Sequence, residues 1–379
     1  MTGDSGARPA EAGQPAGGLA ALKLPLALLA VVPVAPVLAN LTELGPVWVF
    51  VSGALGVAVL ADWVRRSTEQ LAEHVGPAVG GLLTISFGSL AEVILALFVL
   101  AEGKTEVVRA QITGSIIGTS LLGLGLAIVV GGIGRDRQVF KRERAGQLSS
   151  MLILVVIALL LPAVFDFTER RVAGPQQLAI TDEQLSIGVS VVLLALYGAN
   201  LVYTLVTHRG VFAAKEADAE GGSEAAWPLW AAGGVLVAAT AAIALEAELV
   251  SGALEGTAGS LGLTPVFMGV VVLALVGTAA DLFAAAWFAR QDKMGLAISI
   301  CIGSAIQVAL VVAPLLVLAS WAMGKPMTLV FGSPLDLFAI AGTVFIVNAI
   351  ASDGETTWFE GVLLLGVYVL LGLAFFFVG

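Results

Sequence analysis

The chain has 379 residues, of which 58% are hydrophobic and only 12% are charged, with a formal net charge of −10. An ordinary soluble domain has a charged fraction of about 25%, so this composition excludes a soluble enzyme and indicates a polytopic membrane protein. The acidic balance argues against nucleic acid as a partner, because phosphate binding requires a basic surface. The single cysteine, Cys301, excludes an internal disulfide, and His74 and His208 have no companion at metal-ligand spacing.

Residues 1–20 are rich in glycine, alanine and proline and lack the basic start and apolar core of a signal peptide, so we expect a disordered tail. The rest of the chain is dominated by apolar runs of about 17–25 residues, the length that crosses a bilayer as a helix. They predict an all-α membrane protein with about eleven transmembrane helices, at residues 24–42, 45–63, 76–101, 106–133, 147–165, 184–207, 227–249, 264–289, 294–321, 334–351 and 356–378.

The distribution of basic residues predicts how these helices are oriented. With the N-terminus inside, most of the 18 lysines and arginines fall in inner segments, as the positive-inside rule requires. We therefore expect a cytoplasmic N-terminus and an outer C-terminus. The compact length favours a prokaryotic plasma membrane as the host.

Two stretches 189 residues apart share one pattern of a glycine, a hydroxyl and an acid within an apolar run: Gly88 to Glu92 (GSLAE) and Gly277 to Asp281 (GTAAD). The two glycines are expected to break their helices. The same offset relates further residues in the next spans: Lys104 and Lys293, Gly114 and Gly303, Ser115 and Ser304. A repeat over two successive spans indicates a duplicated architecture, as in many secondary transporters.

The repeat divides the chain into an extra first helix and two halves. We expect the extra helix at residues 21–43, a five-helix repeat at 44–207, an acidic cytoplasmic linker at 208–226, and a second five-helix repeat at 227–379. Because each half has an odd number of spans, the two halves insert in opposite directions. Inverted halves of this kind place a binding site near the middle of the membrane.

The two acids, Glu92 and Asp281, are the strongest candidates for chemistry, since intramembrane carboxylates are costly and mark ion or proton paths. A structural hydrogen bond is the alternative for each. Further oxygen-bearing candidates share their helix faces or lie on the next spans: Ser86, Ser89, Ser115, Thr119, Thr278, Ser304 and Gln307. For any single hydroxyl, helix packing or a bond to its own backbone is the alternative.

All of these candidate ligands are oxygen atoms, which suits a hard cation such as Ca²⁺. The cation would be cargo, and the sequence indicates neither a cofactor nor a catalytic residue. Other charges have simpler interpretations. Lys104 is read as an interfacial group at a span end. Glu246, Glu248 and Glu255 are read as an outward acidic cluster that attracts cations, or as a simple interfacial cap.

The residues resemble the calcium/proton exchangers of the calcium/cation antiporter superfamily over nearly the whole chain after about residue 24. The similarity rests on these stretches and residues: Thr68 to Glu73, Gly76 to Leu83, Glu92, Leu97-Phe98, Gly114-Ser115-Ile116, Gly303-Ser304, Gln307, Asp353-Gly354-Glu355, Trp358, Glu360 and Gly361. The resemblance implies eleven helices and exchange of cytoplasmic Ca²⁺ for protons at Glu92 and Asp281.

The chain departs from the family pattern at the signature motifs. The family usually has Asn and Thr where this chain has Ser89 and Ala91, and Asn and Glu where it has Thr278 and Asp281. Two further asparagines of the family correspond to threonines here, Thr84 and Thr119. The resemblance therefore implies the fold and the transporter class but leaves the transported ion open.

The leading hypothesis is a cation/proton antiporter that exports Ca²⁺ by alternating access around the two acids. One alternative is exchange of another cation (Na⁺, K⁺, Mg²⁺ or Mn²⁺) for protons. Another is a transport-inactive relative that acts as a membrane sensor. The sequence has no nucleotide-binding P-loop, which argues against driving by ATP. The partners implied are a hard cation, protons and the lipid bilayer, and the oligomeric state is left open.

Overall fold

The computed structural model describes residues 32, 34–75, 80, 83, 86–170, 174–203 and 227–378. The predicted tail (1–20) and acidic linker (208–226) lie outside these residues. Of the predicted first span, the described part forms α2 (Val34–Leu41). The described part of the predicted third span (76–101) includes a short apolar helix, α5 (Leu90–Ala101).

Nine helices of the described chain are long and apolar enough to cross a membrane, which together with α2 and α5 agrees with about eleven spans. They are α3 (Pro46–Val75), α6–η1–α7 (Thr105–Gly132), α8 (Arg142–Glu169), α9 (Pro175–Val202), α11 (Leu229–Leu261), α12–η3–α13 (Pro265–Arg290), α14–η4–α15 (Met294–Ala322), α16 (Pro334–Asp353) and α17 (Trp358–Phe377). The predicted class, an all-α polytopic membrane protein, is confirmed.

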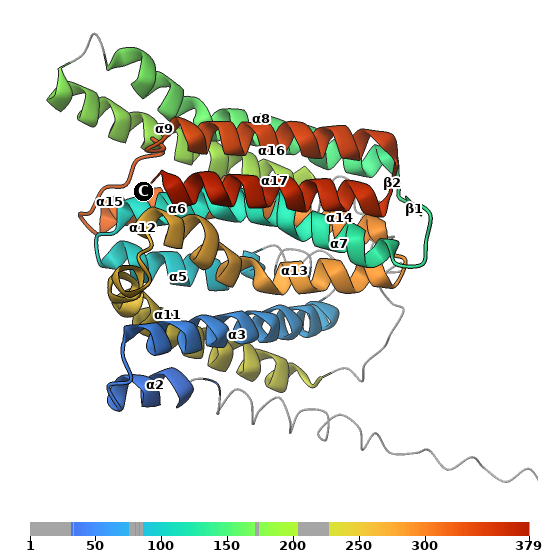
Figure 1. Cartoon of the computed structure of the whole chain (residues 1–379), viewed down its shortest axis with the longest axis horizontal. Helices are drawn as coiled ribbons and strands as arrows, with labels where there is room; N and C mark the ends of the chain where they lie inside the picture. Colours follow the sequence, from blue (N-terminus) through green and yellow to red (C-terminus); the bar gives the residue numbers. More distant parts are fainter. Residues whose placement is uncertain are drawn as a thin grey trace, which may run out of the picture.

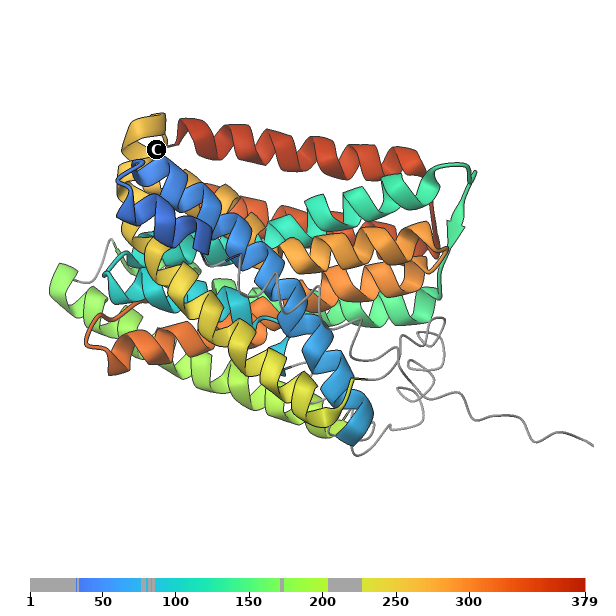
Figure 2. The same ribbon diagram turned by 90° about the horizontal axis from the view of Figure 1, so that it is seen from below.

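Several helices are longer than the apolar runs that predicted them. With 30 residues, α3 continues far beyond the predicted end at residue 63, and α11 has 33 residues. At 1.5 Å per residue they measure about 45–50 Å, more than the hydrocarbon core, so both must tilt. Figure 2 shows α3 and α11 crossing the other helices obliquely. The polar end of α3 stays helical because Arg65 forms ion pairs with Asp62 and Glu69, one turn away on either side.

The two halves run in opposite directions through the molecule. In Figure 1, the helix from α6 to α7 runs from left to right, whereas its counterpart from α14 to α15 runs from right to left. Helices of the two halves also pack against each other: α9 of the first half packs against α15 of the second, and α17 of the second packs against α7 of the first. The predicted inverted repeat is therefore present.

Corresponding helices carry the same irregularity. A π-helical segment, Gly118–Gly123 (η1), interrupts the α6–α7 helix, and another, Val308–Val312 (η4), interrupts α14–α15. Adding 189 to the first range gives residues 307–312, so the two segments are equivalent. A third, Met268–Leu273 (η3), precedes α13. Single π-turns in α-helices occur frequently at functional sites.

A short ribbon joins the two halves at one end of the bundle. Gln138–Val139 (β1) pairs antiparallel with Glu355–Thr356 (β2). The turn before β2 contains Gly354 in the left-handed region at φ 78°, a conformation that glycine adopts without strain. Arg137 Nη1 lies 2.9 Å from Glu355 Oε1, adding an ion pair between the halves.

Candidate functional site

Glu92 lies in the first turn of α5, buried within the bundle with 3% of its surface exposed. The chain makes a turn at Gly88 and Ser89 between helical residues on both sides, so the predicted break at Gly88 is present. The start of a helix favours a negative charge, because the peptide dipoles leave a partial positive charge there. The break thus places a helix N-terminus beside the acid.

Asp281 is presented differently, since it lies within the uninterrupted helix α13 (Ala274–Arg290) and is only partly buried. The expectation that Gly277 breaks its helix is wrong. A Cβ atom at Gly277 would lie 3.3 Å from both Cβ and Cγ of Glu92. Gly277 therefore allows α13 to approach the acid of the other half closely, and the break in this helix is the π-segment η3 instead.

Each acid faces a serine of the following span. Ser115 of α6 lies beside the Glu92 carboxyl, and Ser304 of α14 lies beside Asp281. The two acids are also close enough to interact with each other. Glu92 Oε1 and Ser115 Oγ are fully buried and form no well-aligned hydrogen bond among the described residues. Buried polar atoms of this kind are usual where a water molecule or an ion binds.

The other predicted ligands divide into two groups. Thr119 and Thr278 are buried, and their hydroxyls donate to the backbone carbonyls of Ser115 and Ala274, both at 2.8 Å. These hydroxyls fit the alternative interpretation, a bond to their own helix. Ser86 is exposed. Two further candidates remain beside the acids and their serines. Ser89 is buried at the start of α5, and partly buried Gln307 ends α14 at η4, one turn beyond Ser304.

Arg65 of α3 is a residue near the site that sequence reasoning missed. Its guanidinium interacts with Asp281 as well as forming ion pairs with Asp62 and Glu69 at 2.7 and 2.6 Å. Its Nε is buried without a partner in the described chain. The spacing of Asp62, Arg65 and Glu69 predicts mutual ion pairs on one helix face. Nothing in that spacing indicates which other helix the face meets.

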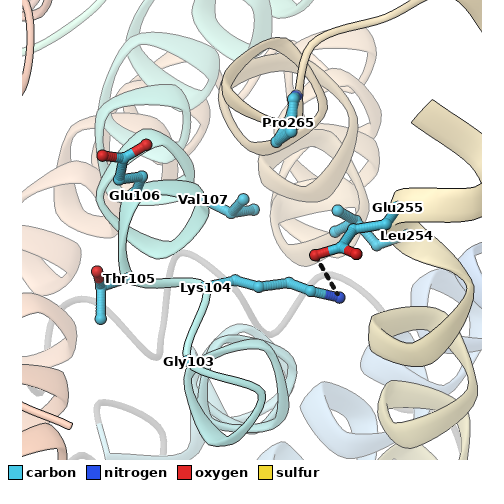
Figure 3. Close-up of a pocket in the computed structure, with 8 residues that line it drawn as sticks. All are labelled: Gly103, Lys104, Thr105, Glu106, Val107, Leu254, Glu255 and Pro265. Atoms are coloured by element: carbon cyan, nitrogen blue, oxygen red, sulfur yellow. Dashed lines mark ion pairs between the residues drawn. The ribbon is translucent and has the colours of Figure 1, made fainter. Parts of the chain in front are cut away.

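Lys104 does not behave as the interfacial group that its position predicted. Its side chain is only 14% exposed and its ammonium lies 3.7 Å from Glu255 Oε1. It also bonds Glu102 and donates to the Ser251 carbonyl at 3.0 Å. Figure 3 shows it reaching from the α5–α6 turn towards α11, beside a cavity of about 320 Å³. Lys104 therefore ties the turn between α5 and α6 to the body of α11.

The site thus provides two carboxylates and the hydroxyls of two serines, Ser115 and Ser304, with Ser89 and Gln307 close by in the chain. Within the described ranges, no three side chains among His, Cys, Asp and Glu gather closely enough to hold a metal ion. Such a set has the chemistry of a site for a hard cation that keeps part of its water and exchanges easily. A permanently bound soft metal has no suitable ligands in it.

Comparison with known proteins agrees with this geometry. The sequence model described as "Sodium/calcium exchanger protein" matches residues 45–206 and 231–377, one segment in each half. The chain belongs to the sodium/calcium exchanger family. It is 40% identical over 341 residues to the Ca²⁺/H⁺ antiporter of Aphanothece halophytica, covering 87% of the chain and 90% of that protein. It is 38% identical over 322 residues to the Ca²⁺/H⁺ antiporter ChaA of Bacillus subtilis, covering 84% and 89%.

Solved structures of the family show the same architecture. The Ca²⁺/H⁺ antiporter YfkE is 32% identical, with a TM-score of 0.78 over 93% of the chain and 98% of that structure. The H⁺/Ca²⁺ exchanger CAX, at 14% identity and a TM-score of 0.62, shares the fold. These relatives confirm the resemblance to the calcium/proton exchangers. The protein is an integral membrane antiporter of this type, which couples a cation to protons.

Proposed function

We propose that the protein exchanges Ca²⁺ for protons by alternating access, with Glu92 and Asp281 as the shared binding groups. The observation that carries the proposal is the duplicated acid–serine pair, Glu92 with Ser115 and Asp281 with Ser304, supplied by the two inverted halves. Relatives that cover most of the chain bear the name Ca²⁺/H⁺ antiporter, which supports both Ca²⁺ and H⁺ as substrates.

The exchange needs no covalent chemistry. When both acids are ionised, two negative charges in a medium of low dielectric constant attract a divalent cation strongly. When the cation leaves, burial favours the neutral form of each carboxyl, so protons take its place. Either load neutralises the pair. An empty, doubly charged site is held back because two unpaired buried charges are costly to move through the bundle.

The direction of transport follows from the proposed orientation. With the N-terminus and the linker of residues 208–226 in the cytoplasm, protons entering down their gradient would drive Ca²⁺ outward. The match of the family to residues 45–206 and 231–377 supports two repeats separated by a linker. Relatives from bacteria support the plasma membrane of a prokaryote as the host.

Flux through the purified protein in proteoliposomes tests this function. With an imposed pH gradient, Ca²⁺ should move against its own gradient and dissipate the proton gradient. The neutral variants Glu92→Gln and Asp281→Asn serve as controls for leaks. Ca²⁺ flux that is indifferent to the pH gradient would contradict antiport and favour a uniport path or a sensor.

Binding measurements test the coupling separately from transport. Two carboxylates that share a divalent cation must release their protons when it binds, so Ca²⁺ affinity should fall as the pH drops from about 8 to about 5. By reciprocal linkage, adding Ca²⁺ to the protein should release protons. Saturable Ca²⁺ binding without proton release would count against a shared site.

A second candidate is another hard cation moved through the same frame. Thr119 and Thr278 stand where the family usually has asparagine, so the amide oxygens of the family pattern are missing beside the acids. A smaller or more strongly hydrated ion such as Mg²⁺ keeps more of its own water and needs fewer protein ligands. Competition of Mg²⁺, Mn²⁺, Na⁺ and K⁺ with Ca²⁺ in the flux assay decides between them.

A further inference from the structure

Glu246 of α11 is a third intramembrane carboxyl, and it has no electrostatic interaction with Glu92 or Asp281. It was read from the sequence as part of an outward acidic cluster with Glu248 and Glu255, and the structure corrects this. Glu246 is 0% exposed, whereas Glu248 and Glu255 are exposed. It lies near the middle of the 33-residue helix α11, about 22–25 Å from either end at 1.5 Å per residue. Its side chain is therefore deep within the bundle.

The carboxyl is enclosed by two glycines of α3. A Cβ atom at Gly56 would lie 3.0 Å from Glu246 Cδ and 3.1 Å from Oε1, and one at Gly53 would lie 3.3 Å from Oε2. Any larger residue at these positions would displace the carboxyl. The pair Gly53 and Gly56, one turn apart, thus forms a cradle that fits the Glu246 head group against the backbone of α3.

Nothing in the described chain compensates a charge on Glu246. Neither Oε1 nor Oε2 has a hydrogen-bond partner among the described residues, and no charged group there interacts with the carboxyl. The charged groups on the elements packed against α11 lie elsewhere. On α5 they are Glu92 and, at its C-terminal cap, Glu102; on α3 they are Asp62, Arg65, Arg66, Glu69, Glu73 and His74; α2 and α12 have none.

Three roles for such a carboxyl can be compared. An ion pair is ruled out within the described chain by the lack of a basic partner, and a metal site by the lack of a second acid. A buried carboxylate without either compensation is very costly, whereas the neutral acid costs no more than an ordinary buried polar group. Only the protonated form is therefore compatible with the close contact between α3 and α11.

We propose that Glu246 is a proton-binding site separate from the Glu92–Asp281 pair, and that α3 packs against α11 as seen here only while this carboxyl is protonated. The bound ligand is the proton itself. Because α3 also packs against α13, the helix of Asp281, and carries Arg65, whose charge acts on Asp281, loss of the Glu246 proton acts on a helix next to the proposed cation site. The proposal does not depend on which cation is transported.

Infrared spectroscopy can detect this proton directly through the carbonyl stretch of a protonated carboxyl group. The measurement uses the full-length protein with Glu92→Gln and Asp281→Asn, so that neither acid of the cation site contributes and the result is independent of the proposed transport function. Adding Glu246→Gln should remove one protonated-carboxyl band at about pH 7. Adding Glu248→Gln, two residues away on the exposed face, should leave the spectrum unchanged.

The thermal stability of the same proteins provides a second readout. Ionising Glu246 within the helix pair costs free energy, so the stability of protein with Glu246 should fall as the pH rises from about 5 to about 8. Glu246→Gln should lose this part of the pH dependence, and Glu248→Gln should keep it. A band and a stability profile that are unchanged by Glu246→Gln would overturn the proposal.

A neutral residue of similar size should also fit the glycine cradle. If Glu246→Gln does not fold, Glu246→Met is measured in the same way, since a protonated acid and a methionine have similar volumes. Failure of both neutral variants to fold would also overturn the proposal, because it would mean that the helix pair requires the charge.

Discussion

The two signature segments reach the same arrangement by different backbones. In the first half, the chain turns at Gly88 and Ser89 and restarts as α5 with Glu92 in its first turn. In the second half, α13 passes through Gly277 and Asp281 without a break, and the irregularity is the π-segment η3 one or two turns upstream. The duplicated sequence thus places matching residues in the two halves, whereas the local backbone around them differs.

This difference makes the two acids unequal. Glu92 is nearly inaccessible, lies at a helix N-terminus, and contacts Gly277. Asp281 is partly exposed, lies within a helix, and interacts with Arg65. Negative charge is therefore balanced by peptide dipoles in one half and by a guanidinium in the other. The following experiments test whether this difference between Glu92 and Asp281 affects exchange, stability and Ca²⁺ affinity.

Removing either acid should have the largest effect. Glu92→Gln and Asp281→Asn each replace a proposed titratable ligand by a neutral group of the same shape. We therefore expect coupled exchange to fall by at least a hundredfold, about 2.7 kcal/mol, with folded protein retained. Flux in proteoliposomes and gel filtration of the purified variants measure both. Exchange close to the unmodified protein in one variant would remove that acid from the site.

The second largest effect should come from alanine at Gly114, and alanine at the equivalent glycine of the other half, Gly303, should have little effect. A Cβ atom at Gly114 would lie 1.9 Å from the Val270 carbonyl oxygen, whereas one at Gly303 would meet nothing within 4 Å. Gly114→Ala should therefore disrupt the contact of α6 with η3. It should lower the free energy of unfolding by more than the roughly 1–3 kcal/mol usual for overpacking, and so prevent folding. Gly303→Ala should change the melting temperature little. Equal stability of the two variants would show that the halves pack alike.

Much of this molecule could be predicted from the sequence because lipid imposes simple rules. Apolar run lengths predicted the spans, and the 189-residue offset singled out Glu92, Asp281 and the two serines that the structure places next to them. The ends of α3 and α11 were missed because their polar turns remain helical outside the apolar run. Hydropathy measures where a segment can meet lipid, and it does not measure where its helix stops.

The remaining errors concern contacts between helices far apart in the chain. Gly277 was expected to break a helix and instead packs against Glu92, and Glu246 was expected at the surface and is buried against Gly53 and Gly56. Nothing in the sequence indicated that the charge of Arg65 acts on Asp281. Each of these depends on which faces of two tilted helices meet, and a periodic pattern on one helix does not contain that information.

Replacing Arg65 should have a moderate effect on Ca²⁺ affinity, through Asp281 of the second half only. Its positive charge repels a cation at Asp281, so Arg65→Gln should raise Ca²⁺ affinity about two- to fivefold at about pH 8, a range that allows for solvent screening. Arg66→Gln is the matched control, because Arg66 also pairs with Asp62 but is more exposed. Calorimetric titration measures both. An unchanged affinity in Arg65→Gln would place Arg65 outside the electrostatic reach of the bound ion.

The smallest effect expected is that of lengthening the second acid. Asp281 is partly exposed, so a longer side chain has room to extend, and Asp281→Glu should bring its charge closer to Glu92 and tighten Ca²⁺ binding by up to about tenfold, or about 1.4 kcal/mol. Lys104→Ala should leave Ca²⁺ affinity within about twofold, because Lys104 holds the α5–α6 turn against α11 through Glu102, Glu255 and the Ser251 carbonyl. Its loss should instead lower the free energy of unfolding by about 1 kcal/mol. Titration and thermal denaturation of both variants separate the two roles. If Lys104→Ala altered affinity as much as Asp281→Glu, the binding site would have to extend to the end of α5, and a site confined to the middle of the membrane would be wrong.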